Sequence, residues 1–142
     1  MAEKIVKLKS GSIMEEKESY SRAVCVGDWI FVSNTAGRNY RTREMSDDAV
    51  EQAKQCFDNI EGALKAVDSS LEDVVMSKIF IPYPDDAPDV MAYVGERLKG
   101  IDPQRTVTCS PLGLAEFKVE IELTAYRGAG MADVERREIS LG

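Results

Sequence analysis

The chain has 142 residues, of which 44% are hydrophobic and 30% are charged, and its formal net charge is −7 at pH 7. This composition predicts one soluble globular domain, and the negative charge argues against nucleic acid as the main partner, because phosphate binding depends on clustered Lys and Arg. The chain contains no histidine, which excludes Ser-His-Asp catalysis, Cys-His catalysis and the usual zinc sites.

The sequence also bears on location and on redox chemistry. No apolar run is long enough to span a bilayer, and the opening MAEKIVKLKSG lacks the apolar core of a secretory signal, so we expect no membrane partner and a cytoplasmic location. Cys25, Cys56 and Cys109 are far apart and form no CxxC motif, which predicts buried free thiols. Only Cys109, four residues after Arg105, has a nearby cation that would favour a reactive thiolate.

The first third of the chain predicts strands. Residues 5–8 alternate with lysines and predict an edge strand, whereas the polar residues 10–17 predict a loop. Two β-rich runs, residues 21–26 and 29–33, flank Gly27-Asp28. This arrangement predicts a hairpin, because Gly adopts a positive φ at little cost.

A turn at Gly37 and a polar loop over residues 38–44 precede the first predicted helix. Residues 46–48 offer a capping side chain and acidic groups that favour a helix N-terminus, and the helix is expected to end near residues 68–70. Apolar residues recur on one side of this helix, at positions Ala53, Phe57, Ile60, Leu64 and Val67. This stripe predicts packing against a sheet.

Residues 74–81 are mainly apolar and β-branched, which predicts an inner strand that is buried on both faces. Prolines end this strand, and residues 86–88 begin a second helix that ends near Gly100. The predicted apolar stripe of the second helix consists of Ala87, Met91, Val94 and Leu98. Met91 is therefore expected to belong to the core.

Residues 103–126 contain the most informative pattern. Arg105 follows a proline, and residues 118–126 then alternate strictly, with Glu120 and Glu122 on the polar face. An arginine near one strand and a glutamate on a neighbouring strand suit a small charged site, in which Arg105 binds a carboxylate and Glu120 holds or activates a water. The alternative is a surface arginine beside a solvated strand face, and the pattern alone favours this alternative.

The order of the predicted elements is strand, hairpin, helix, strand, helix and two strands. This order predicts a two-layer α+β domain, which we place at residues 1–127. Residues 128–142 are small and polar at first and then mixed in charge. They are expected to form a C-terminal extension, either as a short extra element or as a mobile tail.

The ordered motifs resemble the YjgF-type Rid family, the reactive-intermediate deaminases, also called the endoribonuclease L-PSP family. The resemblance covers about residues 5–127 and is carried by Tyr20 followed by VGDWIFVSNTAG, then FDNIEGALKAV, LEDVVMSKIFI, PQRT and KVEIELTAY. It implies a chorismate-mutase-like fold, with a mixed six-stranded sheet and two helices on one face. It also implies a homotrimeric barrel with a cleft at each subunit interface.

The resemblance further implies hydrolysis of 2-imino acids, or of their enamine tautomers, to 2-keto acids and ammonia without a metal or an organic cofactor. In this chain Arg105 matches the arginine that binds the substrate carboxylate, and Glu120 matches the acidic residue beside the hydrolytic water. Tyr20 and Ser33 match positions that line the pocket. Val107 stands where many members have cysteine, and its backbone is expected to face the ligand.

Some positions depart from the family pattern. Besides Val107, Met91 stands where a typical member has asparagine, and residues 34–37 form a variant of the usual loop. These departures put the substrate range in doubt and leave open a non-catalytic trimeric module that binds small carboxylates or partner proteins. Ribonuclease activity, credited to relatives, is disfavoured by the acidic charge and the missing histidine. Tyr20 also suits an interface aromatic residue, and Ser33 suits a plain strand hydroxyl.

Overall fold

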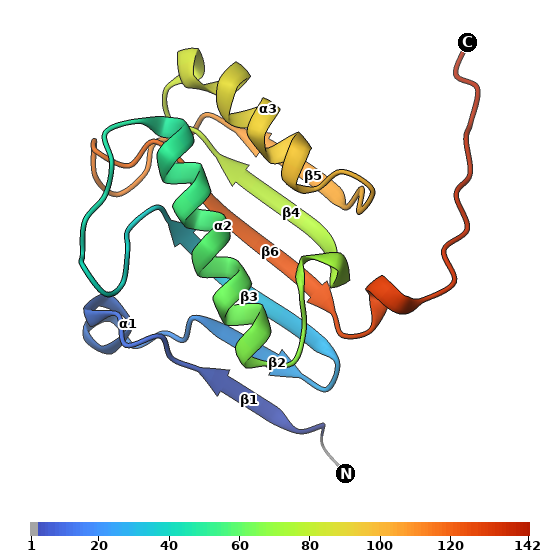
Figure 1. Cartoon of the computed structure of the whole chain (residues 1–142), viewed down its shortest axis with the longest axis horizontal. Helices are drawn as coiled ribbons and strands as arrows, with labels where there is room; N and C mark the ends of the chain where they lie inside the picture. Colours follow the sequence, from blue (N-terminus) through green and yellow to red (C-terminus); the bar gives the residue numbers. More distant parts are fainter. Residues whose placement is uncertain (1–2) are drawn as a thin grey trace.

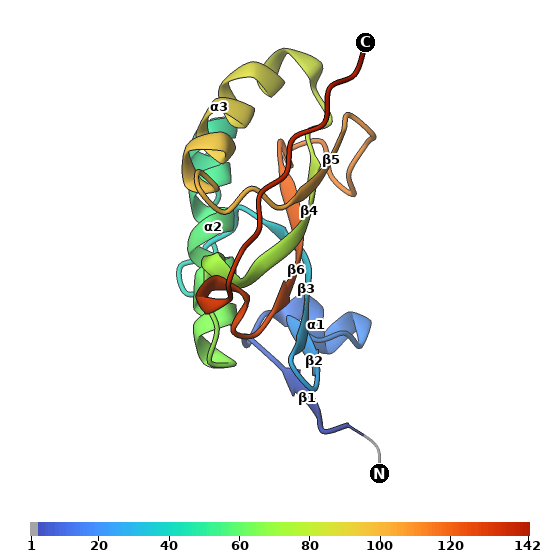
Figure 2. The ribbon, with the colours of Figure 1, turned by 90° about the vertical axis from the view of Figure 1, so that its right-hand side faces the viewer.

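The computed structural model describes residues 3–142. Within these residues the chain forms a mixed six-stranded sheet in the order β1-β2-β3-β6-β4-β5, and α2 and α3 cover the same face of it (Figure 1 and Figure 2). The strands are β1 Ile5–Leu8, β2 Ala23–Val26, β3 Trp29–Ala36, β4 Val74–Phe80, β5 Gln104–Thr108 and β6 Glu120–Tyr126. The helices are α1 Ile13–Glu18, α2 Ala49–Ala66 and α3 Ala87–Arg97, with 3₁₀ turns η1 Leu71–Asp73, η2 Pro84–Asp86 and η3 Ala129–Met131.

The predicted α+β class, the edge strand and the hairpin are confirmed. Strand β1 pairs with β2 at the edge of the sheet, and β2 pairs with β3 across a turn in which Gly27 has a φ of 58°. Strand β3 continues three residues beyond the predicted end at Ser33. Its register with β6 shifts between Val32 and Thr35, so one extra residue bulges out beside the predicted pocket position Ser33.

The two long helices follow the predicted stripes. Helix α2 is capped by Asp48, whose side chain accepts a hydrogen bond from the backbone N–H of Glu51 at 2.8 Å. All five predicted stripe residues are buried, four of them within α2 and Val67 at its C-terminal cap. In α3 the buried positions include Val90, Val94 and the following Leu98, while Met91 is partly buried against the core.

Two predictions about local structure are wrong. Helix α1 lies where residues 10–17 were expected to form a loop. Residues Ser12 and Glu15 have the S-x-x-E spacing of a capping box, but the Glu15 carboxylate instead accepts a hydrogen bond from the backbone N–H of Ser10 at 2.8 Å. Strand β4 is buried on one face only, because both long helices pack on the same side and leave Met76 and Lys78 exposed on the other.

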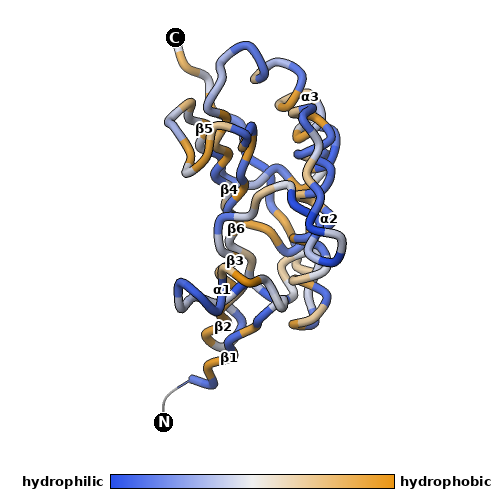
Figure 3. Tube along the Cα trace, turned by 90° about the vertical axis from the view of Figure 1, so that its left-hand side faces the viewer, coloured by the Kyte–Doolittle hydropathy of each residue, from blue (hydrophilic) through white to orange (hydrophobic). Residues whose placement is uncertain are grey.

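The sheet face opposite α2 and α3 carries large exposed side chains. Trp29, Phe31 and Tyr126 are 45%, 46% and 41% exposed, and the rings of Trp29 and Tyr126 meet edge to face at 4.9 Å between centroids. Figure 3 shows hydrophobic segments along the strands, next to hydrophilic segments in α1 and α2. We refer to the sheet face opposite α2 and α3 as the open face.

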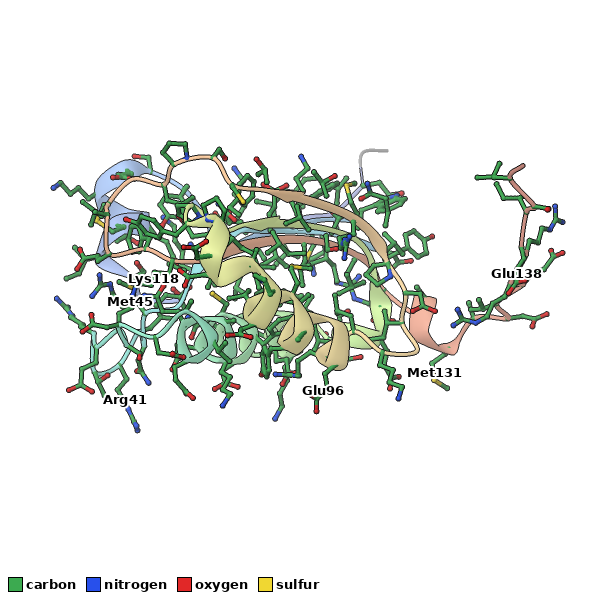
Figure 4. All side chains as sticks on the ribbon, turned by 90° about the horizontal axis from the view of Figure 1, so that it is seen from above. Arg41, Met45, Glu96, Lys118, Met131 and Glu138 are labelled. Carbon is green, nitrogen blue, oxygen red and sulfur yellow. The ribbon has the colours of Figure 1, made fainter. Side chains whose placement is uncertain are left out.

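The C-terminal extension contains one short element, the turn η3 at Ala129–Met131. After η3 the chain has no regular structure up to its last residue, and the segment around Glu138 stands apart from the body of the molecule (Figure 4). Arg136 fastens this segment to the loop before β5, where its guanidinium donates to the Asp102 carboxylate at 2.7 Å and to the Gly100 carbonyl at 2.9 Å. None of the helices in residues 3–142 has the length and apolarity that crossing a lipid bilayer requires.

Candidate functional site

Arg105 lies on β5, a strand at the edge of the sheet. The residue is exposed, and within residues 3–142 no hydrogen bond or ion pair engages its guanidinium. In the parallel register between β4 and β5 it lies opposite Ser77, which is fully buried on the helix-covered face. The guanidinium at this edge is therefore available to an external carboxylate.

Glu120 lies on β6, opposite Phe80 of β4 and Ala36 of β3. Its neighbour Ile121 faces the helices and is buried, so Glu120 belongs to the open face, where it is partly buried. Burial raises the pKa of the Glu120 carboxyl above its ordinary value, and the positive charge of Arg22 acts in the opposite direction. A carboxylate with a raised pKa is a better proton acceptor near neutral pH.

The two predicted catalytic side chains of one chain do not converge. Arg105 and Glu120 are separated by two strand spacings and by three residues along the strands. This places their Cα atoms roughly 14 Å apart, with their side chains on opposite faces of the sheet. Within one chain these two side chains therefore do not form a common site.

The predicted pocket residues have different surroundings. The Tyr20 hydroxyl accepts a hydrogen bond from Arg22 Nη2 at 3.3 Å, on the same side of the sheet as Glu120. The Ser33 hydroxyl donates to the Ser21 carbonyl at 2.7 Å, so its proton is already used in a bond to the segment before β2. Val107 is partly buried and packs against the core.

Sequence reasoning missed a buried ion pair next to these residues. The side chains of Arg22 and Glu15 are 4% and 0% exposed, and Arg22 Nε donates to the Glu15 carboxylate at 3.2 Å. A signal for Glu15 was present in the S-x-x-E spacing that begins α1. No local signal marks Arg22, because its position just before β2 looks like the polar end of any strand.

Two further polar groups are buried near the ion pair. The guanidinium Cζ of Arg22 lies 5.6 Å from the ring centroid of Tyr40, and its Nη1 donates to the Asn34 carbonyl at 3.4 Å. Asn34 Oδ1 and the Tyr40 hydroxyl are buried and make no hydrogen bond within the described part of the chain. Burial raises the pKa of Tyr40 to about 12, so this phenol is neutral at physiological pH.

A separate hollow of about 780 Å³ lies between the C-terminal extension, the start of β4 and the loop before β5. It is lined by residues such as Glu72, Lys99 and Arg136. None of the predicted site residues lines it, so it does not coincide with the surface around Glu120.

Comparison with known proteins places this geometry in a family. The family model described as Endoribonuclease L-PSP matches residues 12–127. The 2-iminobutanoate/2-iminopropanoate deaminase of Dermatophagoides farinae is 34% identical over 108 residues, which are 72% of this chain and 81% of that protein. A RutC family protein of Pyrococcus abyssi is 28% identical over 76% of this chain and 86% of its own length.

Solved structures agree with this assignment. A Mycobacterium tuberculosis member of the YjgF/YER057c/UK114 family has a TM-score of 0.75 and 28% identity, over 87% of this chain and 99% of that one. The YjgF gene product of Escherichia coli has a TM-score of 0.69 and 27% identity, over 76% and 87% of the two chains. The chain is therefore an α+β protein of the endoribonuclease L-PSP class. It belongs to the YjgF-type Rid family, as its motifs predicted.

Proposed function

We propose that this protein hydrolyses 2-imino acids, and the enamines in equilibrium with them, to 2-keto acids and ammonia. The observation that carries the proposal is the 34% identity to a protein named as such a deaminase. Two side chains fit this chemistry: within residues 3–142 no hydrogen bond or ion pair engages the Arg105 guanidinium, and burial raises the pKa of the Glu120 carboxyl. Arg105 binds the substrate carboxylate and Glu120 positions the attacking water.

The chemistry needs positioning more than a strong nucleophile. A protonated imine is already electrophilic, so water adds to its C=N carbon once both are held in place. Glu120 accepts a proton as the new C–O bond forms, and the C=N π electrons move to nitrogen. Glu120 then returns its proton to the amino nitrogen of the carbinolamine, the C–N bond breaks to release ammonia, and the O–H proton passes to water as the C=O bond forms. The product is the 2-keto acid.

We further propose that the site is completed between copies of the chain in a chorismate-mutase-like homotrimer. Because Arg105 and Glu120 of one chain face opposite sides of the sheet, Arg105 of one protomer would meet Tyr20 and Glu120 of its neighbour. The exposed aromatic residues of the open face support this assembly, since a central barrel made of three sheets would bury them. A cleft would then form at each seam between protomers.

The deaminase assay uses an amino acid oxidase or a threonine dehydratase to generate the imine in situ and follows 2-keto acid release. The purified protein is expected to accelerate release. Arg105→Lys is expected to lower kcat/KM by about 10- to 100-fold, because lysine cannot make two parallel hydrogen bonds and a charge-assisted hydrogen bond contributes about 1.5–3 kcal/mol. Arg41→Lys, at an exposed arginine that points away from the sheet (Figure 4), is the control. Equal rates for Arg105→Lys and the wild type would refute the carboxylate role.

The assembly is tested by light scattering coupled to size-exclusion chromatography. The wild type is expected to have the mass of three chains. Phe31→Glu places a charge in the centre of the buried barrel and is expected to give monomers. Ile139→Glu, on the C-terminal extension at 79% exposure, should leave the mass unchanged. A wild type that elutes as one chain would contradict the trimer and the shared site.

The second candidate is a non-catalytic trimeric module that binds small carboxylates or partner proteins. The departures at Val107 and Met91 favour it. A thermal shift with 2-ketobutyrate that depends on Arg105, together with no acceleration of keto acid release, would identify this function.

We also propose that the protein is cytoplasmic. We propose that its domain ends at Arg127 and that residues 128–142 form a C-terminal extension.

A further inference from the structure

We propose that Arg22 is a positioning residue of this site, which fixes the Tyr20 hydroxyl and keeps a positive charge beside Glu120, while Glu15 holds Arg22 in place. This inference deepens the proposed deaminase function and depends on it. Arg22 does not touch substrate in this scheme. It acts through the two side chains that do.

The hydrogen bonds of Arg22 leave its guanidinium in one orientation. Nε donates to Glu15 Oε2 at 3.2 Å, Nη1 donates to Thr35 Oγ1 at 3.0 Å and to the Asn34 carbonyl at 3.4 Å, and Nη2 donates to the Tyr20 hydroxyl at 3.3 Å. The partners come from α1, from the bulged part of β3 and from the segment after α1. A flat, forked cation can satisfy these directions together, whereas the ammonium of a lysine cannot.

Two aromatic rings enclose the guanidinium. Its Cζ lies 5.5 Å from the ring centroid of Tyr20 and 5.6 Å from that of Tyr40. Such contacts attract a cation electrostatically and are stronger where water is excluded, and the residue is only 3% exposed. Tyr20 is therefore held twice by Arg22, through its hydroxyl and through its ring.

Glu15 holds the other end of this network. It is fully buried, and its carboxylate accepts hydrogen bonds from the backbone N–H and the hydroxyl of Ser10 as well as from Arg22. The helix α1 that carries Glu15 has only six residues. A helix of this length is not stable by itself, so we infer that the buried ion pair attaches it to the sheet.

The Glu15 carboxylate contacts the Arg22 guanidinium through one of its three nitrogens. Glu15 contacts only Nε, whereas the Nη groups donate to neutral oxygens of Tyr20, Asn34 and Thr35. Burial raises the pKa of Glu120, and the Arg22 charge counteracts this effect. Four other ionisable groups surround Arg22 and Glu120. They are Glu15 in α1, Tyr20 before β2, Tyr40 after β3 and Cys56 in α2. Tyr40 and Cys56 stay neutral because burial raises the pKa of each.

The test compares the pH profiles of kcat/KM for three variants and the wild type. E15Q removes the ion pair but retains the Arg22 charge, whereas the double variant R22Q/E15Q removes the pair and the charge without leaving a buried ion. E16Q changes an exposed carboxylate one residue away and is the control. Circular dichroism and thermal unfolding establish that each variant is folded.

We expect R22Q/E15Q to lose about 10- to 100-fold in kcat, since small displacements of a site group have effects of this size. Its acidic limb should also move to higher pH, whereas the acidic limb of E15Q should not. The proposal is overturned if folded R22Q/E15Q has the same kcat and the same pH profile as the wild type. It is also overturned if E15Q and R22Q/E15Q lose kcat equally and the acidic limb of R22Q/E15Q does not shift. If the double variant does not fold, R22K replaces it. R22K is expected to keep the acidic limb and lose kcat, and a shifted limb with unchanged kcat overturns the proposal.

An activity-independent measurement separates this inference from the deaminase function. The Glu120 carboxyl is titrated by ¹³C NMR in glutamate-labelled protein, with E120Q used to assign its signal. A higher Glu120 pKa in R22Q/E15Q than in the wild type supports the role of the Arg22 charge even if the wild type is not a deaminase. An unchanged Glu120 pKa overturns that role even if the wild type is one.

Discussion

Gly37 lies where β3 meets α2, and its replacement by alanine is expected to destabilise the protein. A Cβ at this position would lie 2.4 Å from the carbonyl oxygen of Gln52 and 2.6 Å from its Cα, whereas ordinary contacts begin near 3.4 Å. These are backbone atoms of a helix, so they cannot rotate away as the end of a side chain can. The end of β3 and α2 must therefore separate by about 1 Å.

The separation also disturbs hydrogen bonds that join the same two elements. The Asn59 amide donates to the carbonyl of Ala36 at 3.3 Å and to that of Arg38 at 2.8 Å, on either side of Gly37. Overpacking costs about 1–3 kcal/mol, and each weakened hydrogen bond costs up to about 1 kcal/mol. We expect Gly37→Ala to lower the free energy of unfolding by about 3 kcal/mol, which corresponds to a fall in Tm of roughly 10 °C.

Urea unfolding followed by circular dichroism measures this change at a fixed protein concentration, because assembly contributes to stability. Gly62→Ala is the matched control within α2, where no atom lies within 4 Å of the added Cβ. It is expected to stabilise the helix by about 0.5–1 kcal/mol, because alanine loses less conformational entropy than glycine. Neutral surface substitutions change the free energy of unfolding by up to about 0.5 kcal/mol. A Gly37→Ala variant whose free energy of unfolding differs from that of the wild type by no more than this would refute the steric argument.

Two further predictions concern ionisable side chains. Burial acts to raise the pKa of Asp73, but hydrogen bonds from the Ser69 hydroxyl and the Gly130 N–H outweigh it and lower this pKa. The stabilisation that follows from this lowered pKa is present above the unfolded-state pKa of about 3.9 and is lost as pH falls through the folded-state pKa. Asp73→Asn should therefore lower the free energy of unfolding by about 1–2 kcal/mol at pH 7 and by less at pH 3. Urea unfolding at both pH values checks this, and an equal deficit at both would contradict it. The prediction of buried thiols is wrong for Cys109, which is exposed after β5, whereas Cys25 and Cys56 are buried. In the native protein, a thiol-specific disulfide reagent should therefore modify Cys109 and spare the other two, and burial also raises the pKa of Cys56. Modification of all three thiols at equal rates would be inconsistent with this structure.

Local signals predicted most of the elements. The cap at Asp48, the apolar stripe of α2 and the glycine of the β2–β3 turn each act between residues that are near in sequence, so the sequence alone locates them. The motifs from Tyr20 to Tyr126 likewise predicted the family that the comparisons then confirmed. The roles of Arg105 and Glu120 stay predictions, since no comparison assigns them in this chain.

Other features depend on contacts between distant segments. The alternating pattern of β6 shows that Glu120 shares a face with Glu122, but only the strand order and register show that Arg105 lies on the opposite face. The burial of a single face of β4 follows from where α2 and α3 pack, which its apolar sequence does not reveal.

The sequence by itself determined the class of fold, the family and the residue types available for chemistry, because these follow from composition, periodicity and motif order. Only the tertiary structure decided that Arg22 and Glu15 form a buried pair beside Glu120 and that Arg105 stands apart from it. The physical reason is that the free energy of a charge depends on which groups surround it, and folding brings those groups together from α1, the segment before β2, β3 and β6.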